Sequence, residues 1–236
     1  PSFPKNTTPL IPEDPNRQNP ASKRHPGLPG LHCRTYRRKS AASLLTRIAM
    51  QIDPPALPEV LILTPRRFGD ARGWFSETWN AQRMADAGLD LPWVQDNHSF
   101  SAAKGTLRGL HVQSPPRAQD KLVRCSRGAI LDVAVDIRTG SPTYGSHVAV
   151  ELTAYNGRQL FVPKGFLHGF VTLTADTEVQ YKCSDLYSPE NDGAVRWDDP
   201  TLGIDWGTST PILSDKDARA PLLADIGQPF RYGVTE

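Results

Sequence analysis

From residue 50 onward the chain is built of short apolar segments, rich in β-branched residues, that turn signals separate. Arg127 and Gly128 stand between LVRCS and AILDVAVDIR, and residues 175–177 stand between GFVTLT and EVQYKC. HVAVEL is followed by Asn156 and Gly157, a dipeptide typical of a two-residue β-hairpin, and then by RQLFVP. Many short strands with turn signals at this spacing predict an all-β sandwich or barrel.

Only one segment, NAQRMADAG, has the pattern of a short helix, which disfavours an α/β fold. The strands suit a jelly roll, in which two antiparallel sheets enclose a pocket that side chains line from alternate positions. With 236 residues, 38% of them hydrophobic, the chain can bury a sizeable core, and we assign residues 50–236 to one jelly-roll domain. No apolar run approaches the ~18 residues that a membrane span needs, so we expect no membrane partner.

Residues 1–49 differ from the rest in charge and composition. They hold nine of the 27 Lys and Arg residues, two of the 25 Asp and Glu residues and eight of the 22 prolines. Their surplus of +7 leaves −5 for residues 50–236, and their apolar residues follow no strand or helix period. This composition predicts a disordered basic extension, which we interpret as lying upstream of a natural start at Met50.

Two other interpretations of this extension are weaker. SAASLLTRIAM is too short for a secretory signal and carries Arg47 within its apolar part. RTYRRKS could serve as a nucleic-acid arm, but a short basic tail is more often simply solvated, so we expect no nucleic-acid partner. Cys33, Cys125 and Cys183 form no CxxC pair, which argues against a disulfide framework or a zinc knuckle and favours the reducing cytoplasm.

The segment GTLRGLHVQ places two side chains of chemical interest in a strand-like run. In a regular strand Arg108 and His111 would face opposite sides, because side chains alternate with a period of two. Gly109 between them could support a β-bulge that redirects one of the two. With such a bulge, both side chains would enter the pocket.

Two kinds of binding site, one for a metal and one for phosphate, are considered for this pocket. Small β-barrels often bind a metal through an HxH pair, but the position two after His111 is Gln113, a poor ligand, and only His168 remains as a soft donor. The ligand set is incomplete, so we expect no metal. Four basic residues could bind phosphate and three aromatic residues could stack on a nucleotide: Arg72, Arg108, Lys121 and Lys216, and Phe75, Tyr181 and Tyr187.

Several segments, in their order and spacing between residues 60 and 222, resemble the family of dTDP-4-dehydrorhamnose 3,5-epimerases. They are FGDARGWFSETW, VQDNHSFSAAKGTLRGLHVQ, KLVRC, VPKGFLHGF, YKCSDLYSP and LSDKDA. The resemblance implies a cupin-type jelly roll that forms a homodimer and acts without metal or cofactor on a thymidine-diphosphate 4-keto-6-deoxy sugar. The implied isomerase activity belongs to dTDP-L-rhamnose biosynthesis, which supplies lipopolysaccharide and cell-wall polysaccharides.

The resemblance also implies roles for individual residues. His111 matches the proton acceptor, Tyr181 the proton donor, Asp217 the carboxylate that orients His111, and Lys121 a residue beside the sugar. Tyr187 matches the position that stacks against the sugar. Further substrate contacts would come from Arg72, Glu77, Gln95, Asp96, Asn97, Arg108, His168 and Lys216, and from Asp192, which stands where the family usually has glutamate.

The residue types suit this chemistry without the resemblance. A ketone at C4 acidifies the hydrogens at C3 and C5, so epimerisation needs a base, an acid on the opposite face and a cation near the forming enolate. Three alternatives stay open at this point. They are an epimerase that inverts one carbon only, a metal-dependent cupin oxygenase or isomerase, and a protein that binds a sugar nucleotide without catalysis.

Overall fold

The computed structural model of the protein describes residues 50–53, 55–57 and 59–234. Residues 1–49 lie outside this described part. The disorder predicted for them, and the domain boundary predicted at Met50, therefore stay predictions. Among the described residues, no helix is long and apolar enough to cross a membrane.

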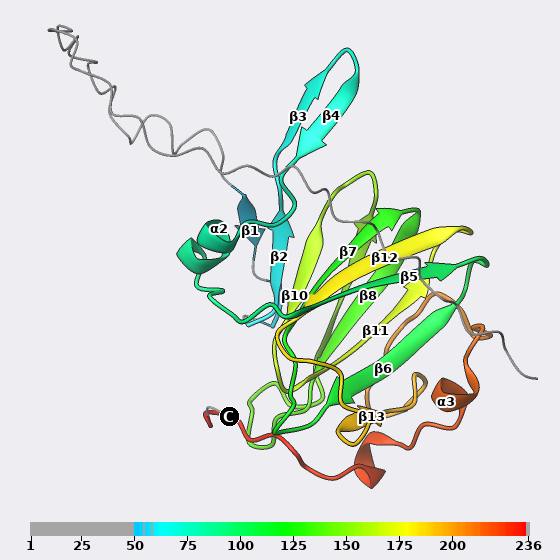
Figure 1. The fold of residues 1–236 in the computed structure, drawn as a ribbon. Helices are drawn as coiled ribbons and strands as arrows, with labels where there is room; N and C mark the ends of the chain where they lie inside the picture. Colours follow the sequence, from blue (N-terminus) through cyan, green and yellow to red (C-terminus); the bar gives the residue numbers. More distant parts are fainter. Residues whose placement is uncertain (1–49, 54, 58, 235–236) are drawn as a thin grey trace, which may run out of the picture. The chain divides into compact units, whose positions relative to one another are not determined.

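Two antiparallel sheets form the body of the described chain (Figure 1). The six-stranded sheet runs in the order β1 (Gln51–Asp53), β2 (Leu61–Thr64), β10 (Gln159–Val162), β7 (Lys121–Arg127), β12 (Thr177–Cys183) and β5 (Gln95–Ser101). The five-stranded sheet runs in the order β13 (Asp192–Ala194), β6 (Leu107–Gln113), β11 (Phe166–Thr172), β8 (Ala129–Asp136) and β9 (His147–Thr153). A separate hairpin, β3 (Arg67–Asp70) and β4 (Gly73–Ser76), projects from the sandwich. This arrangement confirms the predicted all-β jelly roll.

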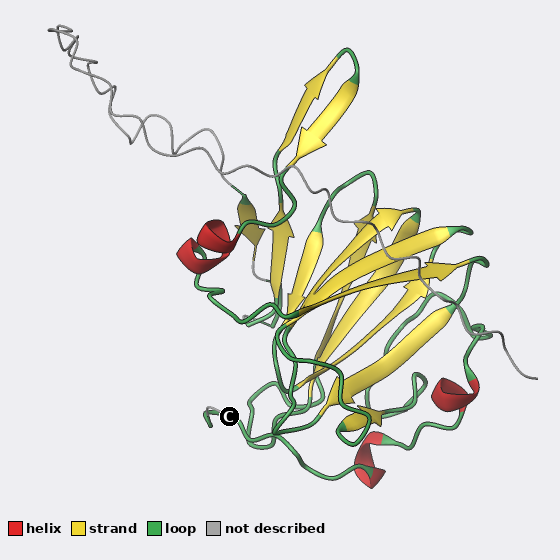
Figure 2. Cartoon of the chain, in the orientation of Figure 1, coloured by secondary structure: helices red, strands yellow, loops and turns green. Residues whose placement is uncertain are grey.

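The helices are few and short, as Figure 2 shows. The predicted helix is α2 (Ala81–Asp86), which begins where the Asn80 side chain accepts a hydrogen bond from the Arg83 amide at 3.1 Å. The polar segment LSDKDA includes one turn of helix, α3 (Asp215–Ala218). A 3₁₀ turn, η1 (Leu223–Asp225), follows it.

The predicted turns are present, but they join the two sheets. The turns after β7, β9 and β11 each carry the chain from one sheet to the other. The hairpin predicted at Asn156 and Gly157 is therefore wrong, although Gly157 has a φ of +65° and the Asn156 carboxamide oxygen accepts from the Arg158 amide at 2.9 Å. Both flanking strands bury one apolar face in the same interior, so they lie opposite each other instead of side by side.

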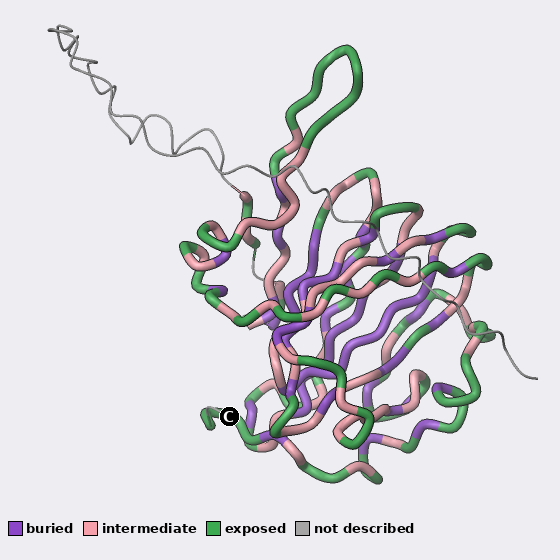
Figure 3. Tube along the Cα trace, in the orientation of Figure 1, coloured by how far each residue is buried: buried purple, intermediate pink, exposed green. Residues whose placement is uncertain are grey.

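Three apolar clusters follow from this layering, and Figure 3 shows the buried chain along the central strands. The first fills the space between the sheets with side chains of both, such as Val150 from β9 and Leu160 from β10. The second covers the outer face of the five-stranded sheet with the C-terminal segment, including Trp206 and Phe230. The third packs α2 against the outer face of the six-stranded sheet. Strand β11 is consequently buried along its whole length.

A β-bulge in β6 confirms the expectation for Gly109. Arg108 pairs with Phe170 and His111 with His168, so two residues of β6 stand opposite a single residue of β11. Gly109 has a φ of +118°, and a Cβ there would lie 2.6 Å from the Gly169 Cα. Only glycine fits this position, and the bulge lets Arg108 and His111 line the same cavity.

Candidate active site

A cavity in the described part of the chain opens between the two sheets. This main cavity has a volume of about 390 Å³, within the range of small-molecule sites. Side chains of both sheets, of α3 and of the segments before β6 and before α3 line it: Ser99, Thr106, Leu107, Arg108, His111, Lys121, His168, Phe170, Tyr181, Ile212, Leu213, Ser214, Lys216 and Asp217.

A second cavity, the side cavity, adjoins the main one. It has a volume of about 280 Å³ and shares His111, Lys121 and Tyr181 with the main cavity as common walls. Its other lining residues are Gln95, Asn97, Val112, Gln113, Gln119, Cys183, Tyr187 and Asp192. Because the shared walls are three of the four candidate catalytic residues, both cavities can hold parts of one elongated ligand.

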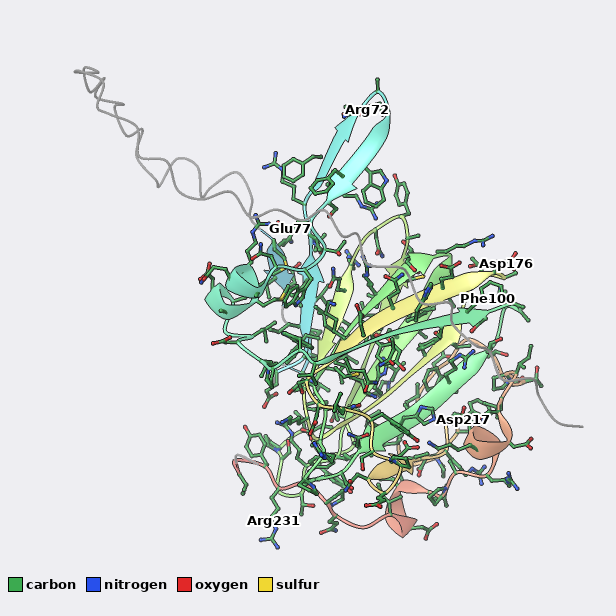
Figure 4. All side chains as sticks on the ribbon, viewed as in Figure 1. Arg72, Glu77, Phe100, Asp176, Asp217 and Arg231 are labelled. Atoms are coloured by element: carbon green, nitrogen blue, oxygen red, sulfur yellow. The ribbon has the colours of Figure 1, made fainter. Side chains whose placement is uncertain are left out.

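His111 on β6 forms a close pair with Asp217 on α3. The His111 Nε2 lies 2.6 Å from the Asp217 Oδ1, and the carboxylate is buried with a relative exposure of 3%. Figure 4 shows Asp217 at α3, next to the edge of the five-stranded sheet. Ser214 begins α3, donates to the Asp217 Oδ2 at 2.9 Å and accepts from the Asp217 amide. These contacts hold the carboxylate in line with the imidazole.

The electrostatics of Asp217 agree with this geometry. Burial alone would raise the pKa of the carboxyl, but the hydrogen bonds from His111 and Ser214 outweigh it and lower the pKa below its usual value. Asp217 is therefore an anion at neutral pH. An anion at this place orients the imidazole and stabilises its protonated form.

Tyr181 and Lys121 enter the same cavity from the opposite, six-stranded sheet. Burial raises the pKa of the Tyr181 hydroxyl, so it keeps its proton at neutral pH. Burial lowers the pKa of Lys121, the first residue of β7, and nearby Cys183 and Asp192 oppose that shift. The cavity thus places His111 on one wall and a protonated phenol on the facing wall.

His168 on β11 forms a second histidine–aspartate pair beside His111. Its Nε2 lies 2.7 Å from the Oδ1 of Asp132 on β8, and both side chains are buried. Within the described residues, the Asp132 Oδ2 has no hydrogen-bond partner. Sequence reasoning missed Asp132, although an acidic residue within the apolar run AILDVAVDIR was a signal.

Most of the predicted substrate contacts lie at the two cavities. The Arg108 guanidinium donates to the Phe100 carbonyl oxygen at 3.1 Å and lines the main cavity with Lys216. Lys216 forms an ion pair with Asp192, which also accepts from the Tyr187 hydroxyl at 3.1 Å. The Asp192 charge raises the pKa of that hydroxyl.

Three of the predicted contacts line neither the main cavity nor the side cavity. Arg72 stands at the exposed tip of the β3–β4 hairpin, where it pairs with Asp70 (Figure 4). Glu77 pairs with Arg83 of α2 at 2.7 Å. Asp96 faces away from its neighbours Gln95 and Asn97, because side chains alternate along β5, and it pairs with Lys182 at 2.9 Å instead.

The residues around His111 do not form a set of metal ligands. Among the described residues, no three His, Cys, Asp or Glu side chains gather as ligands for a metal ion. Gln113, two positions after His111, uses its amide for hydrogen bonds to nearby backbone groups.

Comparison with known proteins shows the family of the chain. A family model described as dTDP-4-dehydrorhamnose 3,5-epimerase matches residues 54–225. The chain belongs to this family. It is 52% identical over 182 residues to the dTDP-4-dehydrorhamnose 3,5-epimerase of Sinorhizobium fredii, which covers 75% of this chain and 91% of that protein.

Two further relatives of the epimerase family bear on the substrate. The crystal structure of the 3,5-epimerase of Legionella pneumophila in complex with dTDP-4-keto-L-rhamnose has 45% sequence identity and a TM-score of 0.76, and covers 79% of this chain and all of that chain. A dTDP-4-dehydrorhamnose 3-epimerase of Streptomyces niveus is 38% identical over 177 residues, which cover 75% of this chain and 85% of that protein. The fold is accordingly the cupin-type jelly roll that the resemblance implied, and the protein is an epimerase of the isomerase class.

Proposed function

We propose that the protein inverts C3 and C5 of dTDP-4-dehydro-6-deoxy-D-glucose to give dTDP-4-dehydro-L-rhamnose, without a metal or cofactor, in dTDP-L-rhamnose biosynthesis. One observation carries the proposal: the His111–Asp217 pair and Tyr181 enter one cavity from opposite sheets. Epimerisation removes a proton from one face of a carbon and returns a proton to the other. Base and acid on facing walls meet this requirement.

His111 acts as the base in the proposed mechanism. Its Nε2 is engaged with the anionic Asp217, so Nδ1 is the nitrogen that takes the proton from C3 or C5. The electron pair of the broken C–H bond moves toward C4 and forms an enolate. Lys121 supplies the cation beside the developing negative charge, and Asp217 stabilises the imidazolium.

Tyr181 completes the inversion from the other side. Its hydroxyl gives a proton to the carbanion carbon on the face opposite to His111, and the electron pair of the O–H bond stays on the phenolate. Arg108 lies close enough to favour that phenolate, since its charge lowers the Tyr181 pKa against the larger effect of burial. Solvent then removes the extra proton from His111 and returns a proton to the Tyr181 phenolate.

Inversion at both carbons is favoured over inversion at one by the degree of similarity. Identity is 52% to the 3,5-epimerase of Sinorhizobium fredii and 38% to the 3-epimerase of Streptomyces niveus. The test is incubation with the 4-keto sugar nucleotide in D₂O, coupled to a 4-ketoreductase, with the product examined by NMR. Deuterium at C3 and C5 with both centres inverted supports the proposal, and deuterium at one carbon supports a single-site epimerase. A substrate that gains no deuterium at either carbon refutes catalysis.

We further propose that the active protein is a homodimer in which the β3–β4 hairpin packs on a second copy. The hairpin exposes Trp74 and Phe75 to 59% and 69%, a large apolar area for a monomer, and carries Arg72. A second copy would cover these rings, and Arg72 of the first copy would then reach the substrate cavity of the second. Light scattering tests the dimer, and Arg72→Ala should then raise KM while kcat changes little.

The cytoplasm is the proposed site of this reaction. Cys125 and Cys183 are buried free thiols, which suit a reducing compartment. Residues 50–236 carry a net charge of −5, which disfavours binding of nucleic acid by this part of the chain.

A further inference from the structure

Gln113 holds the peptide groups on both sides of Tyr187. It lies at the end of β6, two residues after His111, with a relative exposure of 5%. Its Nε2 donates to the carbonyl oxygen of Leu186 at 2.9 Å, and its Oε1 accepts from the amide of Ser188 at 2.9 Å. The same Nε2 donates to the carbonyl oxygen of Arg117.

Gln95, on β5 of the six-stranded sheet, binds the backbone at Tyr187 as well. Its Oε1 accepts from the Tyr187 amide at 2.8 Å, and its Nε2 donates to Asn97 at 3.1 Å. Three successive backbone groups around Tyr187 are thus bound by two glutamine side chains, one from β5 and one from β6. The Tyr187 ring itself remains exposed on the wall of the side cavity.

Only a primary amide can make the Gln113 contacts. The carbonyl oxygens of Arg117 and Leu186 need two N–H donors, and the Ser188 amide needs an acceptor on the same side chain. A glutamate would place negative charge against two carbonyl oxygens. A histidine, the residue of an HxH metal pair, has one ring N–H and one acceptor in its neutral form.

We propose that Gln113 is a positioning residue for substrate binding, which acts by fixing Tyr187 as a stacking surface for the sugar nucleotide. The proposal rests on the function proposed above, because the contact of Tyr187 with substrate follows from the family resemblance. It explains why an amide stands two residues after the catalytic histidine. Without the clamp, the ligand must order the segment around Tyr187 when it binds, and affinity falls.

The test is a double-mutant cycle in the full chain between Gln113→Glu and Tyr187→Ala. Fixing the backbone of about one residue corresponds to roughly a tenfold change in affinity. Gln113→Glu should therefore raise KM and the Kd for dTDP-glucose, which carries a hexose but no ketone, about tenfold and leave kcat within about twofold. In the Tyr187→Ala background the same change should add less than about twofold, because the ring that Gln113 positions is gone.

Arg117→Ala is the matched control. Arg117 pairs with Asp185 at 3.1 Å and so contacts the same segment, but its side chain lines neither cavity. Its removal should leave KM and the affinity for dTDP-glucose within about twofold. A similar loss in this control would show that any loosening of the segment weakens binding and would overturn the specific role of Gln113.

The remaining outcomes separate this proposal from the proposed function. Absence of turnover in the unaltered protein refutes the function, while titration with dTDP-glucose still completes the cycle. Effects of the two substitutions that multiply in the cycle refute the positioning role, as does a Tyr187→Ala variant with normal affinity for dTDP-glucose. If Gln113→Glu does not fold, Gln113→Met, which keeps the length without charge, takes its place with the same expectations.

Discussion

Replacing Asp217 by asparagine tests the pair on which the proposed base depends. The substitution keeps the size and planar shape of the side chain and removes its charge. Asparagine can still accept from His111 through its carboxamide oxygen, and Ser214 can still begin α3. We therefore expect a folded protein with an intact cavity, in which the imidazole has lost its anionic partner.

The geometry sets the expected loss of rate. The 2.6 Å contact between the His111 Nε2 and the Asp217 Oδ1 is a charge-assisted hydrogen bond, and such bonds contribute about 1.5–3 kcal/mol. At about 1.4 kcal/mol per tenfold in rate, Asp217→Asn should lower kcat by roughly tenfold to 150-fold. The His111 side chain is about one-third exposed, which favours the lower part of this range. His111→Ala, which removes the base itself, should cost at least ~100-fold.

Two measurements check this reasoning. Single-turnover rates, with deuterium exchange at C3 and C5, should show slower proton removal at both carbons in Asp217→Asn and normal rates in Asp215→Asn, an exposed control on the same turn of helix. Unchanged kcat in Asp217→Asn, or an equal loss in the control, would refute the role of the pair.

The second measurement follows the free energy of unfolding against pH. The folded-state pKa of Asp217 is lower than the ordinary value of 3.8, so the ionised carboxylate stabilises the fold above that pH. This contribution is lost as pH falls below about 4, through the lower folded-state pKa. The stability difference between the unaltered protein and Asp217→Asn should thus shrink in that range, and a difference independent of pH would contradict the ionic origin.

Three further predictions concern the acid, the cation and the extension. Tyr181→Phe should let deuterium exchange at the substrate carbons persist while inversion slows, as NMR would show; equal loss of both would assign Tyr181 to binding instead. Lys121→Met should abolish most activity, because it removes the cation beside the developing enolate. Burial lowers the pKa of Lys121 from 10.5, so its charge destabilises the fold at neutral pH, and the melting temperature of Lys121→Met relative to the unaltered protein should fall as pH rises toward 10. A chain that begins at Met50 should melt within a few degrees of the full chain and epimerise at the same rate; dissociation of its dimer or a large fall in turnover would show that residues 1–49 belong to the functional unit.

The strand pattern predicted the fold class, but not which strands pair. Alternation of apolar and polar residues reports that one face of a strand is buried, and it holds equally for a neighbour in the same sheet and for one in the facing sheet. Asn156 and Gly157 do form a tight turn, yet β9 and β10 enter different sheets. Local turn chemistry cannot settle this choice, because it depends on apolar partners far away in the sequence.

The candidate site was predicted where a short motif carries the chemistry. Gly109 signalled the bulge, and His111 stands directly after it. Asp217 lies 106 residues further along the chain, so only the family resemblance connected it with His111. Asp132 was missed because a single acidic residue in an apolar strand gives no sign of which buried histidine it meets.

The polar interior of the sandwich has a structural consequence. Asp132 and His168 occupy inward positions of β8 and β11, where apolar side chains would otherwise fill the space between the sheets, and the cavity beside them removes further packing contacts. The apolar clusters on the outer faces of both sheets offset this loss. The C-terminal segment, which places Asp217 beside His111, therefore also supports the site through Trp206 and Phe230, because these side chains bury the reverse side of the strands that bear His111 and His168.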